Sequence, residues 1–476
     1  MPNRLIPACG GFVAVACLVT MAVPGAAATK TSALAFAAPV KLTIDKGFGG
    51  YEPAVIVTKN GTIVATAHKQ NHTLVISPDS RSATKLRSMS WLWYSGDNGK
   101  SFNDLPGLTP LQEQNAEFGD EGDLAYDEAG KVYFVDTNVT DNSVSRWSND
   151  SKGVLKLEAT RPVGPFGEPV DDRPWITAHG NGVVAYLGNQ GDKASYPLPN
   201  LAPGQAGNGV GPGRYTVYMS YDGATTFNPI GLQLKDSGWC RPAADHRPGS
   251  KRFVVMCGDD GGASAIEQTE GSIKNSVGHI YSYVSEDDGK SWNRYPVATY
   301  NARDPWSTYP SVNIAKNGTI TALYLDHTTK TNCDTVTATT FGCASAIDKS
   351  SLRLFSSVNG RTWTARDVTP PDHPVMRYSW SDLAPDGTVG IVYYAAKTHS
   401  SDWYLRAATA KSLRAKFTHT QVSPHKVISA AFGAPLGDFF TASFGPDSKL
   451  NVVWTSVNDD IVAEGLNSDI FYARQR

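Results

Sequence analysis

Two eight-residue stretches decide the fold of this chain, Ser95-Gly96-Asp97-Asn98-Gly99-Lys100-Ser101-Phe102 and Ser285-Glu286-Asp287-Asp288-Gly289-Lys290-Ser291-Trp292. Both fit the pattern S-x-D-x-G-x-[ST]-[WF]. The Ser and Asp side chains of this pattern can accept hydrogen bonds from backbone amides in a tight turn, and the Gly permits a positive φ. The aromatic residue can then insert between neighbouring sheets. Each stretch therefore predicts a turn between two antiparallel strands.

Two degenerate copies extend this pattern along the chain. Residues 356–363 lack the Asp, and in residues 220–227 the Gly is displaced. The spacings indicate a repeating unit of about 60 to 70 residues, with one copy missing in the first interval. The pattern is the Asp-box, or BNR repeat, and the chain resembles the sialidase superfamily of β-propellers. The resemblance implies that the boxes lie on outer turns, away from a catalytic face.

A second recurrence sets the number of units. A strand, a turn that ends in Gly and another strand occur seven times, at residues 53–67, 122–136, 174–188, 242–258, 310–326, 379–394 and 440–456. The chain ends on a further strand, so residues 38–44 could supply the outer strand of the last blade and close the ring. We expect an all-β chain, a β-propeller of seven four-stranded antiparallel blades. Six blades plus a divergent insertion is the alternative, because familiar sialidases have six.

The composition agrees with many turns and packed aromatic strands. The 476 residues include 44 Gly and 29 Pro, aromatic residues make up 10%, and only 18% are charged. A formal net charge of -2 argues against a general nucleic-acid binder, because it creates no field that concentrates phosphate backbones. The chain also lacks a Gly-rich phosphate loop, a G-x-S-x-G elbow and an H-E-x-x-H motif. These absences argue against an NTPase, a serine hydrolase and a zincin.

The N-terminus has the pattern of a secretory signal peptide. Arg4 precedes an apolar stretch at residues 11–23, and the small residues Gly25, Ala26, Ala27 and Ala28 follow it. We therefore expect a signal peptide at residues 1–28 and a single propeller domain at residues 29–476, in a secreted, monomeric protein. An uncleaved anchor is the alternative. No later stretch approaches the length of a membrane span.

Four cysteines remain after the predicted signal peptide. In an oxidising compartment they suggest two local disulfides, most simply Cys240 with Cys257 and Cys333 with Cys343. Metal ligation is the poorer reading, because the four form no C-x-x-C pair and no His has finger spacing beside them. We predict no cofactor. A structural Ca²⁺ could bind the acidic loops at residues 120–123 and 258–261.

Aligning the seven units on the turn Gly makes equivalent positions comparable. The residues just before or at the start of each innermost strand should surround one end of the central channel, and we call them the entry ring. The entry ring comprises Glu52, Glu121, Arg173, Arg241, Tyr309, Tyr378 and Phe439. One position earlier in each unit lie Tyr51, Asp120, Asp172, Cys240, Thr308, Arg377 and Asp438. The second strands return to the same end and bring His68, Thr137, Asn189, Asp326, His327 and Tyr394.

The entry ring collects carboxylates, guanidinium groups and phenols. This set suits an enzyme that holds and cleaves an anionic sugar. We expect an acidic glycan as the partner. The alternative is that Asp172, Arg173 and their neighbours form ion pairs that join the blades.

Tyr378 begins a segment, residues 378–394, that looks like the Y-S-x-L-x-x-x-P-D-G-x-x-G-L-L-Y-E segment around the nucleophilic Tyr of bacterial sialidases. The resemblance implies that Tyr378 is a nucleophile, since a neutral phenol avoids repulsion from a carboxylate at the anomeric centre. Two departures are that Tyr394 stands where the family has Glu and that Leu383 is displaced. A packing role for Tyr378 is the alternative.

Residues 51–55 stand where sialidases carry an R-I-P-A-L segment, and the substrate-binding Arg of that segment is missing. Arg173, Arg241 and Arg377 could rebuild a carboxylate clamp, because guanidinium groups bind carboxylates through two hydrogen bonds. As acid/base candidates we take Glu52, Glu121 and Asp172. The further residues that we expect to contact a substrate are Tyr309, Asp326 and Tyr394.

A second enzyme class fits the same residues. The chain resembles seven-bladed polysaccharide lyases in which His and Tyr act as acid and base while Arg neutralises a uronate carboxylate. His68, Tyr378, Arg173 and Arg241 offer that set, although a lining role for His68 is the alternative. The leading hypothesis is an exo-acting, sialidase-like glycoside hydrolase. A uronate lyase and a non-catalytic propeller that binds glycan or protein are the alternatives.

Overall fold

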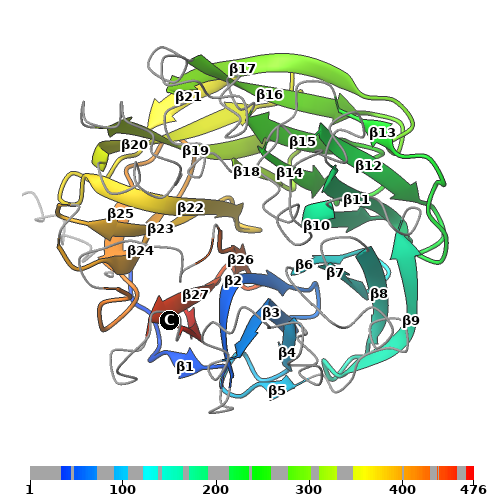
Figure 1. The fold of residues 1–476 in the computed structure, drawn as a ribbon, viewed down its shortest axis with the longest axis horizontal. Coiled ribbons are helices and arrows are strands. Elements are labelled where there is room, and N and C mark those ends of the chain that lie inside the picture. The colour runs from blue at the N-terminus through cyan, green and yellow to red at the C-terminus, as the bar shows by residue number, and fades with distance from the viewer. Residues whose placement is uncertain are drawn as a thin grey trace, which may run out of the picture. The chain divides into compact units, whose positions relative to one another are not determined.

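Each predicted strand–turn–strand unit forms the two innermost strands of one antiparallel sheet, and seven such sheets surround a central axis (Figure 1). The computed structural model describes residues 34–43, 48–71, 90–104, 122–137, 142–163, 171–190, 214–234, 239–258, 277–301, 310–329, 347–398, 401–428, 437, 439–457 and 468–476. Every sheet has four strands. The prediction of a seven-bladed propeller is therefore confirmed, and the alternative of six blades is wrong.

The blades follow one another in chain order. Blade 1 contains β2 (Phe48–Val57), β3 (Ile63–Asn71), β4 (Trp91–Ser95) and β5 (Asn103–Asp104). Blade 2 contains β6 (Gly122–Tyr126), β7 (Lys131–Thr137), β8 (Asn142–Asn149) and β9 (Leu155–Val163). Blade 3 contains β10 (Asp171–His179), β11 (Val183–Gln190), β12 (Arg214–Ser220) and β13 (Leu232–Gln233). Blade 4 contains β14 (Trp239–Ala244), β15 (Phe253–Gly258), β16 (Val277–Ser285) and β17 (Asn293–Asn301).

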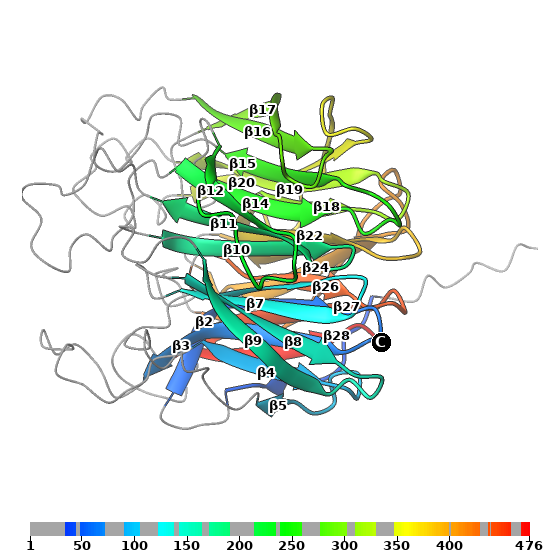
Figure 2. The same ribbon diagram turned by 90° about the vertical axis from the view of Figure 1, so that its right-hand side faces the viewer.

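The remaining blades have the same construction. Blade 5 contains β18 (Ser311–Ile314), β19 (Ile320–Thr329), β20 (Ile347–Ser357) and β21 (Thr364–Asp367). Blade 6 contains β22 (Val375–Leu383), β23 (Val389–Ala396), β24 (Tyr404–Ala410) and β25 (Thr418–Gln421). Blade 7 contains β26 (Ala442–Phe444), β27 (Leu450–Val457), β28 (Ser468–Arg474) and β1 (Val40–Lys41). Figure 2 shows the ring of blades from the side.

The two ends of the described chain meet in blade 7. Its strand order is β1-β28-β27-β26, so a strand from the N-terminal side completes the last sheet. Lys41 and Thr43 both bond the buried carboxylate of Asp469, at 2.7 Å and 2.6 Å. The predicted closure by a strand from residues 38–44 is confirmed for β1 at Val40–Lys41, and residue 44 lies outside the described residues. The closure leaves β28 without a free edge.

The Asp-box turn at residues 95–102 has the predicted chemistry. The Ser95 hydroxyl accepts a hydrogen bond from the Gly99 amide at 2.9 Å, and Asp97 Oδ1 accepts from the amides of residues 100 and 101. Several hydrogen bonds to the carboxylate outweigh desolvation and lower the pKa of Asp97 to about 2. The ring of Phe102 packs edge-on against Tyr472 of blade 7, at 4.9 Å between centroids. The box thus joins the two sheets at an outer turn.

In the two degenerate boxes, other residues form the same hydrogen bonds within the turn. Ala224 takes the place of the Gly with φ 58°, and its amide donates to Ser220 at 2.9 Å. In residues 356–363 the acting hydroxyl is that of Ser357, and Asn359 Oδ1 accepts from the amides of residues 361 and 362. A side-chain amide oxygen therefore replaces the missing carboxylate.

The core lies between neighbouring blades. The cluster between blades 6 and 7, for example, combines Val392 and Leu405 with Val452 and Trp454.

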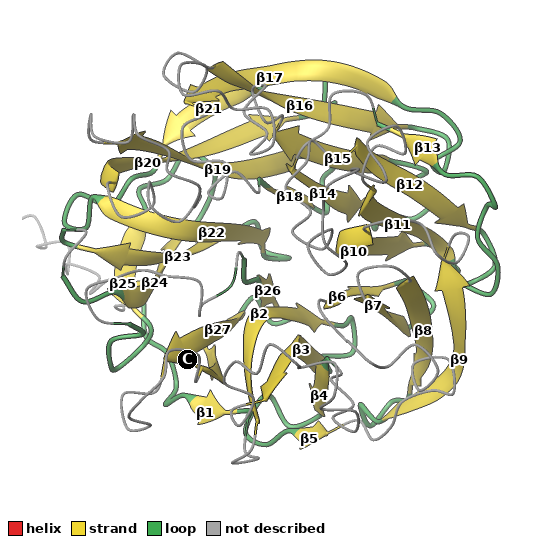
Figure 3. Cartoon of the chain, in the orientation of Figure 1, coloured by secondary structure: helices red, strands yellow, loops and turns green. Residues whose placement is uncertain are grey.

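Cys240 and Cys257 are paired in register on β14 and β15 and form the predicted disulfide. Cys333 and Cys343 lie outside the described residues, as does the predicted signal peptide. Within the described ranges, no helix is long and apolar enough to cross a membrane, and the regular elements in Figure 3 are strands.

Candidate functional site

Three innermost strands change register at the entry ring. β2 has an irregularity between Tyr51 and Ala54, β10 between Asp172 and Trp175, and β22 between Arg377 and Ser379. A β-bulge redirects the side chain at such a point. The sequence alignment of the units thus identified positions that are also equivalent in structure.

Two of these bulges hold non-glycine residues in a left-handed conformation. Glu52 has φ 53° and Tyr378 has φ 40°. This conformation costs of order 1–3 kcal/mol for such residues and persists where the surroundings impose it, often at functional sites. The strain in blades 1 and 6 therefore marks the entry ring as a candidate site.

Tyr51 and His68 form a hydrogen-bonded pair. They are direct partners in the β2–β3 ladder, so their side chains share one face of the sheet. The Tyr51 hydroxyl lies 3.0 Å from His68 Nε2, and the two rings stack with 4.0 Å between centroids. Both side chains are half-buried. Because the phenol and the imidazole can each donate or accept, the pair can transfer a proton.

The Glu52 side chain reaches from blade 1 to blade 7. It is 4% exposed, and a Cβ placed on Gly437 would lie 2.1 Å from its Cγ. Gly437 also has φ 73°. Only glycine fits beside Glu52 at this point, so the carboxylate is held by packing between the first and last blades.

Arg241 lies buried among four other blades. Its guanidinium carbon is 3.1 Å from the ring centroid of Trp175 and 4.6 Å from that of Phe439. Its Nη1 is 3.9 Å from Asp123 Oδ2, and Trp380 contributes a third ring at 4.9 Å. Burial raises the pKa of Asp123, and the charge of Arg241 opposes that shift. Arg241 has 1% of its surface exposed, so its guanidinium group joins blade 4 to these neighbouring blades.

Tyr378 and its neighbours occupy blade 6. The Arg377 guanidinium carbon lies 5.9 Å from the Tyr378 ring centroid, and the rings of Tyr378 and Tyr394 meet edge to face at 6.4 Å. Tyr394 is fully buried, and its hydroxyl accepts a hydrogen bond from the Thr455 amide at 3.0 Å. Burial strongly raises its pKa. Tyr394 therefore joins blades 6 and 7 at the position where sialidases carry Glu.

The structure describes only some of the other residues that the sequence predicted for the site. The backbones of Asp172 and Arg173 belong to β10, and nothing is stated of their side chains. Asp326 belongs to β19, opposite Ser351, and is half-buried. Glu121 and Tyr309 lie outside the described residues, as do residues 120 and 259–260 of the proposed Ca²⁺ loops. Among the described residues no cluster of His, Cys, Asp and Glu is arranged to hold a metal ion.

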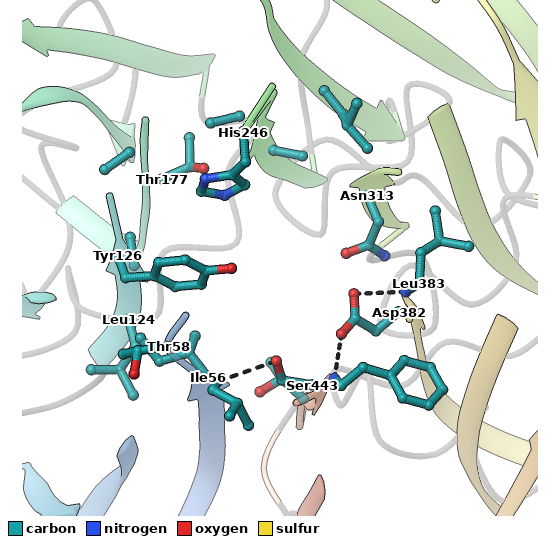
Figure 4. A pocket seen from close by; sticks show the side chains of 18 of the residues that line it. Ile56, Thr58, Leu124, Tyr126, Thr177, His246, Asn313, Asp382, Leu383 and Ser443 are labelled. Atoms are coloured by element: carbon teal, nitrogen blue, oxygen red, sulfur yellow. Dashed lines mark hydrogen bonds between the residues drawn. The ribbon is translucent and has the colours of Figure 1, made fainter. Parts of the chain in front are cut away.

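Sequence reasoning missed a cavity at the other end of the innermost strands. It has a volume of about 660 Å³, and all seven blades line it. Its polar side chains include Tyr126, His246, Asn313 and Asp382 (Figure 4). Reading the aligned units at the C-terminal ends of the same strands would have found this second set of polar residues.

The comparisons with known proteins concern the fold. No protein-family model matches the chain, and a search of curated proteins finds no match. Among solved structures, the chain is similar to a polysaccharide lyase of family PL25, an ulvan lyase bound to -[GlcA(1-4)Rha3S]-. The TM-score is 0.50 at 11% identity, over 91% of this chain and 95% of that one.

Two other solved structures give lower scores. A protein of unknown function from Dyadobacter fermentans has a TM-score of 0.48 at 15% identity, covering 94% of this chain and 99% of that one. The GH93 α-L-arabinofuranosidase of Fusarium graminearum, in complex with arabinobiose, has a TM-score of 0.45 at 10% identity, covering 93% and 98%. The chain is a seven-bladed β-propeller, and its fold is similar to that of a polysaccharide lyase.

Proposed function

We propose that the protein cleaves a uronate-containing glycan at the entry ring by β-elimination. The hydrogen-bonded pair of Tyr51 and His68 carries the proposal, because elimination needs a base at the sugar ring and an acid at the leaving oxygen. The similarity of the fold to that of a polysaccharide lyase is compatible with this reaction.

Each proton has an assigned route. Tyr51 takes the proton from C5 of the uronate while its own hydroxyl proton passes to His68 Nε2. The C4–O bond to the neighbouring sugar breaks, a C4=C5 double bond forms, and Tyr378 protonates the departing oxygen. Arg173 and Arg377 offset the charge of the uronate carboxylate, which acidifies the C5 proton. Glu52 and the buried Arg241 act from neighbouring blades as positioning residues for the entry ring.

The test is an assay on uronate-bearing polysaccharides, ulvan among them, that follows absorbance near 235 nm (roughly, for an unsaturated uronate) together with reducing ends. We expect absorbance to rise. Tyr51→Phe and His68→Ala should each lower kcat/KM by about 100-fold or more, the usual contribution of an acid–base group. The matched controls Tyr221→Phe and His425→Gln, in exposed side chains, should leave the rate unchanged.

Hydrolysis through Tyr378 is a second candidate, favoured by the strained φ of that residue and by its likeness to the sialidase nucleophile segment. Here Tyr378 attacks the anomeric carbon and water later releases the sugar. Reducing ends without absorbance, lost in Tyr378→Phe and retained in His68→Ala, would overturn elimination and support hydrolysis. Binding of glycans without turnover of any substrate would contradict both reactions.

A further inference from the structure

The cavity at the C-terminal ends of the innermost strands has the features of a ligand site. Its volume of about 660 Å³ falls in the range of small-molecule pockets. The walls combine apolar side chains such as Leu124 and Ile176 with a few polar groups from separate blades. Figure 4 shows Tyr126 and His246 on one side of the cavity and Asn313 with Asp382 on the other. No residue of the proposed catalytic reaction, apart from the buried Arg241, belongs to this lining.

Asp382 is the distinctive group in the cavity. Its Oδ1 accepts from the Leu383 amide at 2.8 Å, and its Oδ2 accepts from the Phe444 amide at 2.6 Å. Among the described residues, no Lys, Arg or His lies within ion-pair distance of its carboxylate. Burial raises the pKa of Asp382 to about 6, so the group is mostly ionised at pH 7.0. Among the residues that the structure describes, this carboxylate therefore has no counter-ion in contact with it, although the charge of His246 across the cavity lowers its pKa.

The other charged side chains that line the cavity either form ion pairs or are exposed to solvent. Arg241 pairs with Asp123, Arg247 with Asp245, and His246 with Glu128. The two lysines in the lining, Lys59 and Lys316, are exposed to solvent. A positive group inside the cavity would therefore find Asp382 as its partner.

The wall opposite Asp382 is aromatic. Tyr126 stacks on the His246 ring with 4.9 Å between centroids and an interplanar angle of 11°. Burial raises the pKa of Tyr126 to about 12, and the charges of Asp382 and Glu128 add to this shift. A phenol ring attracts cations through its face and apolar carbons through its surface.

We propose that this cavity binds a small organic ammonium ion of about the size of one sugar ring, with its nitrogen at the Asp382 carboxylate. The carbon skeleton lies against Tyr126 and the apolar walls, and hydroxyl groups of the ligand can bond Asn313. The cation neutralises the one carboxylate of the described cavity that has no counter-ion, which favours an ammonium compound over a neutral one.

The test is titration calorimetry of the full-chain protein at pH 7.0 with glucosamine, with 1,4-diaminobutane and with glucose as the uncharged match of glucosamine. We expect both ammonium compounds to bind and glucose not to bind. Asp382→Asn should weaken binding about 30-fold or more, as expected when one partner of a buried charge pair is removed. Asp386→Asn, an exposed carboxylate in the following turn, is the matched control and should bind as the parent does.

A second variant covers the case in which Asp382→Asn does not fold. Asn313→Lys keeps Asp382 with its backbone bonds and places a tethered ammonium group in the cavity, so it should abolish binding of both amines. Equal binding of glucose and glucosamine would overturn the proposal, as would binding that persists in Asn313→Lys. Failure of both amines to bind would overturn it too. Glycan cleavage, measured in parallel, should be unchanged in all these variants, so failure here is distinguishable from failure of the proposed function.

Discussion

The surroundings of a buried histidine next to blade 6 disfavour its protonated form. Arg406 Nη1 lies 2.7 Å from His373 Nδ1, and Asp372 lies at 3.0 Å on the same nitrogen. Desolvation lowers the pKa of His373, Arg406 lowers it further, and Asp372 opposes both. The imidazole is therefore harder to protonate in the folded protein than in the unfolded chain.

This residue predicts a pH dependence of stability. The native pKa of His373 is below its ordinary value of 6.5, so its contribution is complete above about pH 6.5 and is lost as the pH falls through the native value. Relative to His373→Gln, the parent protein should lose free energy of unfolding on acidification below pH 6.5. Urea unfolding at pH 7.5, 6.5 and 5.5 measures the difference, with the exposed His425→Gln as control. Parallel curves for parent and His373→Gln would refute this account.

At the scale of one element, the Asp-box turns offer an internal comparison. Asp97 accepts two backbone amides, and Asn359 holds the same kind of turn in blade 5 with an amide oxygen. We expect Asp97→Ala to cost about 1–2 kcal/mol of unfolding free energy, because the turn amides lose a charged acceptor. Asp97→Asn should cost less. Denaturant unfolding ranks the three proteins. An unchanged unfolding free energy in Asp97→Ala would show that the bonds of the carboxylate do not stabilise the turn, and equal losses in both variants would show that an amide oxygen does not replace it.

The strands and turns were predictable because their signals are local. A turn Gly with positive φ occurs in the innermost hairpins of blades 1 to 6, and Ser448 takes its place in blade 7. Asp-boxes occur in blades 1, 3, 4 and 5. These local patterns, with the repeat of strands, sufficed for all seven hairpins and for the Cys240–Cys257 pair. The box at residues 220–227 shows the limit, since Ala224 adopts the positive φ that the pattern reserves for Gly. The sequence could not predict the bulges at Glu52 and Tyr378. Their φ values oppose the intrinsic preference of these residues and are imposed by neighbouring blades.

At the scale of the whole molecule, the repeats predicted which residues lie at one end of the channel, but they did not predict the contacts between blades. Aligned units identified which residues share one end of the channel, and the structure adds that Tyr51 pairs with His68 while Arg241 is enclosed by rings from other blades. The cavity around Asp382 forms only where seven strands converge. No single unit carries its signature, so only the complete ring shows that Asp382 has no counter-ion among the described residues.

Ring closure is a property of the whole chain that can be tested at one residue. Asp469 is buried and accepts hydrogen bonds from Lys41 and Thr43, whereas Asp447 in the same blade forms an exposed pair with Arg474. Exposed pairs contribute about 0–1 kcal/mol, but removing a buried acceptor leaves the Thr43 hydroxyl without that bond. We expect Asp469→Ala to lower the unfolding free energy by about 2–3 kcal/mol and Asp447→Ala to change it little.

Hydrogen exchange locates that loss. The amides of Ala37 and Leu42 bond the carbonyls of Arg474 and Ile470, so they report directly on whether β1 stays attached to β28. In Asp469→Ala these amides should exchange faster than those of β26 and β27, because the ring opens first at its closing strand. An opened ring also exposes the edge of β28, which predicts concentration-dependent association. Uniform acceleration across blade 7, or equal effects of the two variants, would mean that Asp469 stabilises the blade as a whole and does not act as its closure.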